Sequence, residues 1–537
     1  MHVLTKPPQR FKNKNGRFGL RRSCAFRRPQ TEKQRHGEPM TQTSAPKTFF
    51  GHPIQLSTLF HIELWERFSF YGLQGILLLY LYYETAKGGL GIDKSLAGGI
   101  VGAYSGTVYL STVFGAWVAD RIAGAEKTLF VSGIVVMCGH IVLALVPGIG
   151  GLLCGLVLIA LGSGGVKSSA SSMVGSLYES DELRPLRDAG FSIFYISINI
   201  GAFFGPLVTG LLQDKIGFHY GFGAAAVGMA VGLWLYSFGR KTLPHTPPPH
   251  PLPASQYKYF FAALAAIAIA IGIAAATGRL NILNFPQVLL ACVILAALGY
   301  FARLLGSTRI AARKKRHIAA YIPLFLAVCV FWAVWFQVYT SVTVYFAETV
   351  NRDIFGFTVP VSWKDSVQGM WVVLFSGMMA AMWTKMGARQ PKTPLKFALA
   401  LIVTGASYLI FLPFIHSGTP MPMAVFALVL LAITLGELLI SPIAMSLATK
   451  IAPAAFKTQM VALNFLAFSL GFTLGGLLFD KFHHPESAAG MAHLLARIGL
   501  GTGEADFYLL LFYIGAACGL LLLLAAPLLN RLLEGAD

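Results

Sequence analysis

Long stretches of apolar residues dominate the chain, and short polar segments separate them. A helix needs about 20 predominantly apolar residues to cross the hydrocarbon core of a bilayer. Fourteen such stretches predict fourteen membrane-spanning helices, at residues 57–83, 96–119, 128–147, 151–175, 189–212, 218–239, 257–277, 284–304, 320–347, 366–386, 395–415, 421–449, 458–479 and 506–530. The pattern therefore predicts an all-α polytopic membrane protein with both termini on one side.

Lysine and arginine are unevenly distributed between the loops on the two sides. Short cytoplasmic loops of membrane proteins collect these residues. With the N-terminus inside, the inner loops and the C-terminus carry 20 Lys and Arg residues against 8 acidic ones, whereas the outer loops carry 8 against 10. We therefore expect both termini to be cytoplasmic.

A proline-rich segment after the sixth span indicates how the spans are grouped. Its prolines, from Pro244 to Pro253, cannot continue a helix. Two plain Ala/Ile/Leu spans and a basic segment follow before the last six spans. The predicted parts are a six-helix bundle (51–239), a linker (240–256), two extra helices (257–304), a basic linker (305–319), a second six-helix bundle (320–531) and a tail (532–537). Two six-helix halves are typical of a rocker-type transporter.

The net charge of +19 does not require a nucleic-acid partner. Only 12% of the 537 residues are charged, against about 25% in soluble proteins. Residues 1–50 alone hold twelve Lys and Arg against two Glu, and their polar composition predicts a disordered tail. This tail is either a transit peptide, an RNA-binding arm or sequence upstream of a true start at Met40; we favour the last interpretation for residues 1–39.

Charged residues inside the predicted spans are rare. A charge at the bilayer centre costs about 2.5–3.5 kcal/mol on insertion scales, so it normally faces a polar cavity and a partner. The ionisable residues concerned are Glu63, Glu66, Arg67, Lys167 and Glu437.

The first span carries three of these charges on one helix face. Glu63, Glu66 and Arg67 lie at positions i, i+3 and i+4, and Tyr71 follows four residues later. Burial raises the pKa of a carboxylate and a nearby cation lowers it, so a movement that changes the pairing changes the affinity for a proton. The alternative is a structural ion cluster that locks the helix.

Lys167 and Glu437 are isolated charges in other spans. Lys167 follows a glycine-rich stretch that allows close helix packing, and we expect Glu63 or Glu66 to be its acid; the alternative is a snorkelling lysine. Glu437 precedes Pro442, which predicts a kinked helix. An anionic site there and a cationic one near Arg67 would suit a ligand charged at both ends, whereas a packing role for Glu437 is the alternative.

Other chemistry has little support in the sequence. His483, His484 and His493 lack a closed ligand spacing, which predicts no metal site, and no P-loop is present. His61 and His140 are expected to be hydrogen-bonded core residues. The sequence also lacks the repeated filter of a channel and the constellation of a membrane enzyme. We therefore expect a transporter without a cofactor.

The motifs resemble those of the proton-dependent oligopeptide transporters, a branch of the major facilitator superfamily. The first span is similar to the family motif ExxERFxYY, with Phe68 and Tyr71 in place and Phe70 at the first Tyr. Further matches, over residues 50–531, contain Tyr109, Asp120-Arg121, Lys167, Tyr195, Asn199, Trp332, Gln337, Glu437 and Ser441. The two extra helices resemble the pair found in bacterial members.

The resemblance implies import of di- and tripeptides with protons by alternating access, across a bacterial inner membrane and by a monomer. The proton gradient would drive transport. Glu63, Glu66, Arg67 and Lys167 would couple protons, and Arg67 and Lys167 would also face the peptide carboxylate. By the same analogy, Glu437 and Asn199 would receive the amino terminus, and Tyr71, Tyr109 and Trp332 would line the pocket.

Departures from the family pattern lie in the pocket walls. Gln368 stands where the family has Asn, Asn464 replaces a Trp, and Gln74 stands where many bacterial members have Arg. Trp335 and Phe336 replace acids of some relatives. A member of the same family that carries another small zwitterion or an anion is therefore the alternative function.

Overall fold

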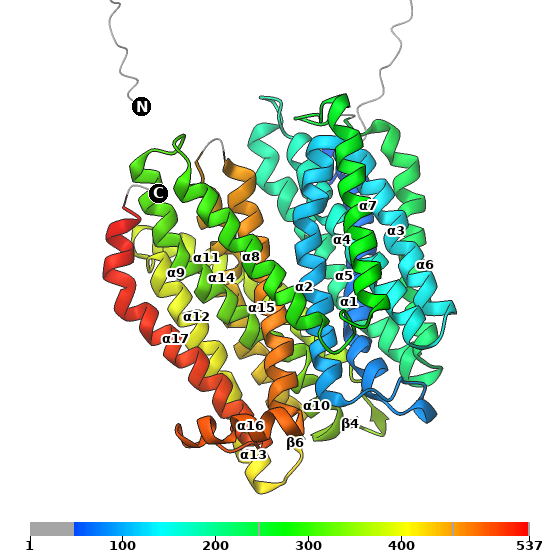
Figure 1. Ribbon diagram of the computed structural model, residues 1–537, viewed down its shortest axis with the longest axis vertical. Helices are drawn as coiled ribbons and strands as arrows, with labels where there is room; N and C mark the ends of the chain where they lie inside the picture. The colour runs from blue at the N-terminus through cyan, green and yellow to red at the C-terminus, as the bar shows by residue number, and fades with distance from the viewer. Residues whose placement is uncertain (1–47, 245–246, 454–455, 535–537) are drawn as a thin grey trace, which may run out of the picture. The chain divides into compact units, whose positions relative to one another are not determined.

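The computed structural model describes residues 48–244, 247–453 and 456–534. The first part of the chain forms six long helices. In Figure 1 they run from blue to green. They are α1 (Gln55–Tyr82), α2 (Lys94–Val118), α3 (Ala125–Leu145), α4 (Gly148–Ser176), α5 (Arg187–Lys215) and α6 (Phe218–Gly239).

The remaining helices follow the proline-rich segment. The 3-10 turns η5 (Phe336–Tyr339) and η7 (Tyr408–Phe411) join helix pairs end to end, so that each pair forms one span. The helices are α7 (Ala254–Ala276), α8 (Phe285–Gly306), α9 (Ala312–Trp335), α10 (Ser341–Glu348), α11 (Trp363–Met386), α12 (Thr393–Ser407), α13 (Leu412–Ser417), α14 (Met423–Ile451), α15 (Lys457–His483), α16 (Pro485–Ala496) and α17 (Glu504–Leu532).

Short elements cap the long helices. Single turns are η1 (Thr85–Lys87), η2 (Ala119–Ala123), η3 (Arg184–Leu186), η4 (Arg240–Thr242) and η6 (Gly387–Arg389). Three two-stranded ribbons pair β1 (Thr48–Phe49) with β2 (His52–Pro53), β3 (Val350–Asn351) with β6 (Met421–Pro422), and β4 (Asp353–Ile354) with β5 (Phe357–Thr358). These ribbons and α16 were not predicted from the sequence. Of the predicted tail, only residues 48–50 lie within the described residues, and they belong to the first ribbon.

A helix covers each of the fourteen predicted spans, but only part of the predicted span number is confirmed. In the described part of the chain, 12 helical segments are long and apolar enough to cross a membrane. The two that fall short are α1 and α2, with 28 and 25 residues. Three charged residues lower the hydropathy of α1, and Gly, Ser, Thr and Tyr residues lower that of α2. That these two helices also cross the membrane stays a prediction.

The helices pack in two sets. Among α1 to α6, the most extensive packing joins α3 and α2 to α4, and α1 to both α5 and α6. Among the later helices, α12 packs on α14 and α17, and α9 packs on α15. The sets meet where α2 packs on α15 and where α5 packs on α11. A Cβ added at Gly102 would lie 2.7 Å from Gly476 Cα, so these glycines allow α2 and α15 to approach closely. The domain boundaries stay predictions.

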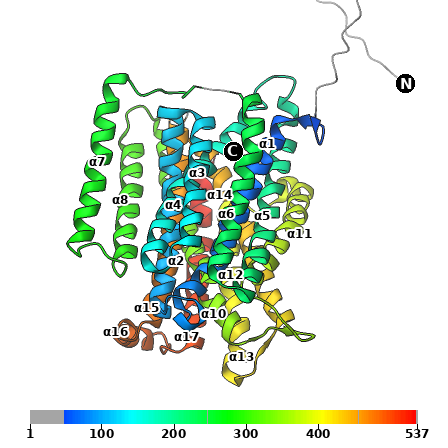
Figure 2. The ribbon, with the colours of Figure 1, turned by 90° about the vertical axis from the view of Figure 1, so that its right-hand side faces the viewer.

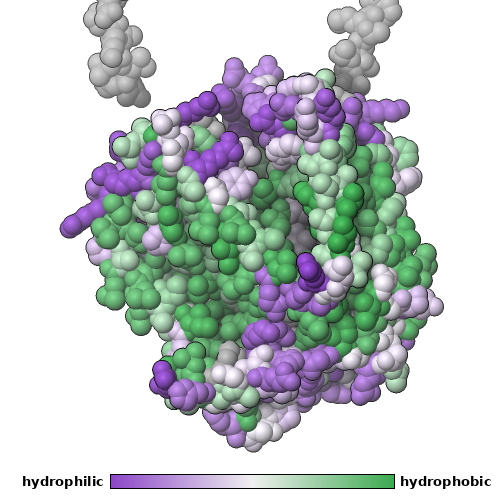
Figure 3. Space-filling model, viewed as in Figure 1, coloured by the Kyte–Doolittle hydropathy of each residue, from purple (hydrophilic) through white to green (hydrophobic). Residues whose placement is uncertain are grey.

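The outward-facing side chains are those of a lipid-facing surface. Figure 3 shows an apolar middle zone, with polar residues gathered mainly toward the two ends. The helix α7 buries none of its residues, whereas α8 contacts α2, α9 and α15; Figure 2 shows both on the outside of the helices. Exposed apolar area on this scale is stable only next to lipid or a partner.

Candidate functional site

Three ionisable residues of α1 form a buried ion cluster. Arg67 Nε lies 2.7 Å from Glu63 Oε1 and 3.3 Å from Glu66 Oε2. The i, i+4 spacing puts Glu63 and Arg67 next to each other, and both glutamates are almost completely buried. Gly201 of α5 faces the cluster, because a Cβ added there would lie 2.7 Å from Arg67 Cβ. The glycine therefore lets α5 pack closely over the charges.

Lys167 of α4 joins the cluster from a second helix. Its Nζ lies 3.6 Å from Glu66 Oε1 and 4.0 Å from the centroid of the Phe70 ring. Of the two acids that the sequence analysis named as partners for Lys167, the structure brings Glu66 into contact. A Cβ added at Gly115 of α2 would lie 2.6 Å from Gly165 Cα. The glycine stretch before Lys167 therefore lets α2 pack closely on α4, the helix that carries Lys167.

Glu66 lies between two cations and is not exposed at all. One of its oxygens faces Arg67 and the other faces Lys167. Because a buried charge depends on its partners, breaking a buried pair costs about 3–5 kcal/mol. A proton on Glu66 cancels its charge and weakens both ion pairs together. The cluster can therefore convert the binding of a proton into a change of pairing between α1 and α4.

An inner cavity of about 220 Å³ lies between the two sets of helices. Gln74 lines it, and so do eight of the predicted site residues: Tyr71, Tyr109, Tyr195, Asn199, Trp332, Gln368, Glu437 and Ser441. They come from α1, α2, α5, α9, α11 and α14. Residues distant in the sequence thus meet at one concave site, which is the usual form of a small-molecule pocket.

A larger cavity of about 860 Å³ continues from the inner one. The two cavities share Tyr195, Glu437 and Ser441. The larger one extends along α11 and α14 to Lys392 and Lys450, at the helix ends that carry the basic loops. A solute next to Glu437 therefore has a path to this end of the molecule.

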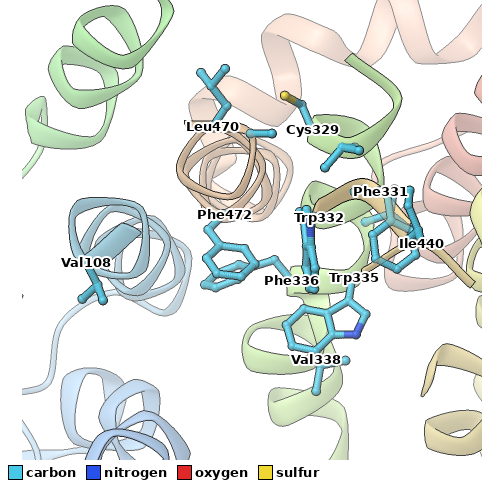
Figure 4. Packing of buried hydrophobic residues seen from close by; sticks show 14 of the residues in the cluster. Val108, Cys329, Phe331, Trp332, Trp335, Phe336, Val338, Ile440, Leu470 and Phe472 are labelled. Atoms are coloured by element: carbon cyan, nitrogen blue, oxygen red, sulfur yellow. The ribbon is translucent and has the colours of Figure 1, made fainter. Parts of the chain in front are cut away.

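Aromatic residues form much of the inner wall. Trp332 and Phe468 have ring centroids 4.4 Å apart, and the Tyr109 ring stacks on Phe468 at 5.0 Å. Figure 4 shows Trp332, Phe336 and Phe472 gathered beside Trp335. Phe468 and Phe472 were not predicted as site residues, because aromatic residues at helical spacing have the same pattern in a core and in a pocket.

Glu437 of α14 accepts a hydrogen bond from the indole of Trp335, at the end of α9. Trp335 Nε1 donates a hydrogen bond to Glu437 Oε2 at 3.0 Å. A hydrogen bond to a charged group is stronger than one between neutral groups. In the sequence, Trp335 is noted only as a replacement for an acid, whereas in the structure it contacts Glu437 directly.

Four of the predicted substrate-binding residues do not line the inner cavity. Arg67 and Lys167 lie behind its wall, in the ion cluster. Gln337 is fully buried and donates hydrogen bonds to Ala333 O at 3.1 Å and to Gly475 O at 3.0 Å, so it holds the break between α9 and α10. Asn464 is also buried away from the cavity wall. Sequence spacing alone could not show which face of a helix meets the cavity.

In the described part of the chain, five charged residues outside the five predicted within spans are also buried: Glu126, Lys364, Asp365, Lys396 and Asp480. Lys364 and Asp365 were assigned to an outer loop, but α11 begins at Trp363 and the structure buries both side chains. Lys364 Nζ lies 2.5 Å from Asp365 Oδ1. Two adjacent charged residues lower the mean hydropathy of a sequence window as much as polar loop residues do. Lys364 and Asp365 were therefore wrongly assigned to a loop.

Hydrogen bonds also join the start of α11 to α5. Ser362 Oγ, Trp363 Nε1 and Ser366 Oγ donate hydrogen bonds to the carbonyl oxygens of Pro206, Leu207 and Phe203, at 2.8, 3.1 and 2.7 Å. These bonds join the two sets of helices at the end of the inner cavity opposite to Lys392 and Lys450. The cavity is therefore closed at one end and continues to the other.

The two histidines within spans behave differently. His61 Nδ1 lies 2.7 Å from Ser57 O, in agreement with the predicted hydrogen-bonded role. His140 is fully buried, and neither ring nitrogen has a hydrogen-bond partner in the described part of the chain. The prediction of a hydrogen-bonded His140 is therefore wrong in this structure.

Comparison with known proteins places this geometry among transporters. A family model described as the POT family matches residues 126–494. The uncharacterized transporter YclF of Bacillus subtilis (strain 168) is 39% identical over 507 residues, which cover 93% of this chain and 98% of that protein. A di-/tripeptide transporter of Lactococcus lactis subsp. cremoris is 39% identical over 471 residues, 84% of this chain and 94% of that protein. A crystal structure of a peptide transporter, POT, in complex with sulfate matches with a TM-score of 0.84 and 37% identity, covering 91% of this chain and 98% of that one.

Proposed function

Since this chain belongs to the POT family and is a transporter rather than an enzyme, we propose that it imports di- and tripeptides together with protons. The observation that carries the proposal is a fully buried Glu66 between two cations, next to a cavity with a carboxylate, Glu437, on its wall. One group can bind the proton, and the other can bind the amino terminus of a peptide. The name of the Lactococcus lactis relative supports the peptide as substrate.

In this proposal the peptide lies across the inner cavity. Its amino terminus pairs with Glu437 and contacts Asn199, while Tyr71, Tyr109 and Trp332 surround it. Its carboxylate points toward Arg67 and Lys167, which here are paired with Glu66. A proton on Glu66 weakens these pairs, so the two cations become available to the carboxylate. Proton binding and peptide binding would therefore support each other.

Alternating access follows from the two ends of the cavity. The bonds from α11 to α5 close one end, and the larger cavity reaches the basic helix ends at the other. We propose that the basic end is cytoplasmic, because cytoplasmic loops collect Lys and Arg. The structure would then be an inward-facing state of a protein in a bacterial inner membrane, with both termini in the cytoplasm. A monomer would suffice for transport, because one chain contains the whole path.

Uptake into proteoliposomes tests the proposed function. With an acidic outside and a neutral lumen, radiolabelled dialanine should accumulate inside, and a protonophore should abolish the accumulation. Tripeptides should compete, and single amino acids should not. If dialanine neither enters nor competes with any solute that enters with protons, the peptide assignment is wrong. Entry of another zwitterion or an anion would then support the alternative function, which Gln368 on the cavity wall favours.

The hydrogen bond from Trp335 to Glu437 provides a test of the binding site. Trp335→Phe removes the indole N–H and keeps an aromatic ring in the wall. Hydrogen bonds to charged groups contribute about 1.5–3 kcal/mol, so the Kd for dialanine should rise about tenfold in a titration by microscale thermophoresis. Trp371→Phe is the matched control, because Trp371 Nε1 donates to Ala427 O at 3.0 Å and lines neither cavity. An unchanged Kd in Trp335→Phe would remove Trp335 from this role.

A further inference from the structure

We propose that Asp365 forms a subsite for a positively charged side chain, so that the transporter favours peptides with a lysine or arginine residue. The inference rests on the proposed peptide transport and adds the charge of the preferred side chain. The feature behind it is a buried carboxylate on the wall of the inner cavity with one oxygen free.

The partner of Asp365 is held away from the cavity. Lys364 Nζ contacts Asp365 Oδ1 at 2.5 Å and donates a hydrogen bond to Val338 O at 2.9 Å. The same ammonium lies 5.4 Å from the centroid of the Tyr339 ring. Lys364 is itself fully buried and does not line the inner cavity. The lysine thus fixes the orientation of Asp365, while Lys364 itself does not line the inner cavity.

The second oxygen of Asp365, Oδ2, is buried and has no hydrogen-bond partner among the described residues. The whole residue is 7% exposed. Gly75 of α1 faces this oxygen, since a Cβ added there would lie 3.1 Å from Oδ2. A side chain at this position would narrow the space beside the oxygen. An ionised carboxylate accepts about four hydrogen bonds, so the pair with Lys364 leaves capacity for a second cation.

The charges on the cavity wall have one sign. Asp365 and Glu437 are the charged residues among the described ones that line the inner cavity. The nearest cations of the ion cluster, Arg67 and Lys167, are held by Glu63 and Glu66 behind the wall. A solute that enters therefore meets two carboxylates. In the proposed pose Glu437 pairs with the amino terminus, which leaves Asp365 for a second positive group.

Electrostatic complementarity then determines the preferred peptide. A buried carboxylate binds an ammonium or guanidinium group in a medium of low dielectric constant, where the attraction is stronger than in water. A neutral side chain of the same length would leave Oδ2 unpaired. An acidic side chain would be repelled by both carboxylates. The two carboxylates of the cavity wall therefore predict the highest affinity for peptides with a basic side chain, a lower affinity for neutral side chains and the lowest affinity for acidic ones.

Competition for dialanine uptake into proteoliposomes tests the subsite. Ala-Lys, Ala-Met and Ala-Glu have side chains of similar length and different charge. Equal potassium concentrations with valinomycin hold the membrane potential at zero, so that peptide charge does not alter the driving force. Ala-Lys should inhibit at a concentration about tenfold lower than Ala-Met, because a well-placed buried charge pair is worth at least a factor of ten. Ala-Glu should be the weakest inhibitor.

Two variants separate the subsite from a structural role of the pair. In Asp365→Asn, the inhibitory concentrations of Ala-Met and Ala-Lys should differ by no more than about twofold. The double variant Lys364→Met with Asp365→Asn should show the same small difference, and it leaves no unpaired buried lysine. Asp353→Asn is the matched control, since Asp353 is exposed in β4, and should keep the wild-type ratio. A structural pair would change the uptake of all peptides equally. Failure of dialanine to enter would refute peptide transport itself, whereas dialanine entry with equal inhibition by Ala-Lys and Ala-Met would refute only the subsite.

Discussion

Glu66→Gln should reduce the accumulation of dialanine to equilibration, where the wild-type protein accumulates it about tenfold. For a symporter that moves one proton per peptide, an inward gradient of one pH unit supplies about 1.4 kcal/mol, which is a factor of ten in concentration. Glutamine cannot take up a proton, and it leaves Arg67 and Lys167 with Glu63 as their only acid in the cluster. The measurement is the steady-state ratio of labelled dialanine inside and outside, at zero membrane potential.

A matched control separates loss of coupling from loss of protein. Glu84→Gln makes the same substitution at an exposed position after α1, and it should accumulate dialanine like the wild type. Glu66→Gln should still exchange labelled for unlabelled dialanine, because counterflow needs no net proton transfer. Accumulation by Glu66→Gln equal to that of the wild type would remove Glu66 from the coupling role.

Glu437→Gln should raise the Kd for dialanine by at least about 30-fold. Truncating one partner of a buried charge pair costs about 2–5 kcal/mol, and Glu437 is the carboxylate on the wall that both cavities share. The loss should come from the positive charge of the amino terminus. Titration of the purified variant with dialanine measures it directly.

A chemically matched ligand provides the control for this variant. N-acetylated dialanine lacks the ammonium group, so it should bind weakly to the wild type and no more weakly to Glu437→Gln. A variant that loses affinity for both ligands in equal proportion would indicate a general disturbance of the cavity. An unchanged Kd for dialanine would contradict the assignment of Glu437 to the amino terminus.

Local rules were sufficient to predict the helices and the ion cluster. Each apolar window of about 20 residues became one helix or two helices joined by a 3-10 turn, since every backbone polar group in lipid must be bonded internally. The contact of Glu63 with Arg67 follows from spacing within one helix. The contact of Lys167 with Glu66 was predicted from a weaker argument, namely that a buried lysine needs an acid.

Contacts between helices decided what the sequence could not predict. Gln337 and Asn464 belong to expected site motifs, but the packing turns them away from the inner cavity. Trp335 was treated as a loss of charge, and only the approach of α9 to α14 reveals its bond to Glu437. Lys364 and Asp365 were counted as loop residues, because a hydropathy window cannot distinguish a buried ion pair from an exposed one.

The central claim is that dialanine and a proton enter together. It is tested most directly by the lumenal pH of proteoliposomes that contain a pH-sensitive dye, with the pH initially equal on both sides and the membrane potential held at zero. The account predicts that external dialanine acidifies the lumen of wild-type proteoliposomes and leaves the lumen of Glu66→Gln proteoliposomes unchanged. Entry of labelled dialanine into wild-type proteoliposomes without any acidification would contradict it.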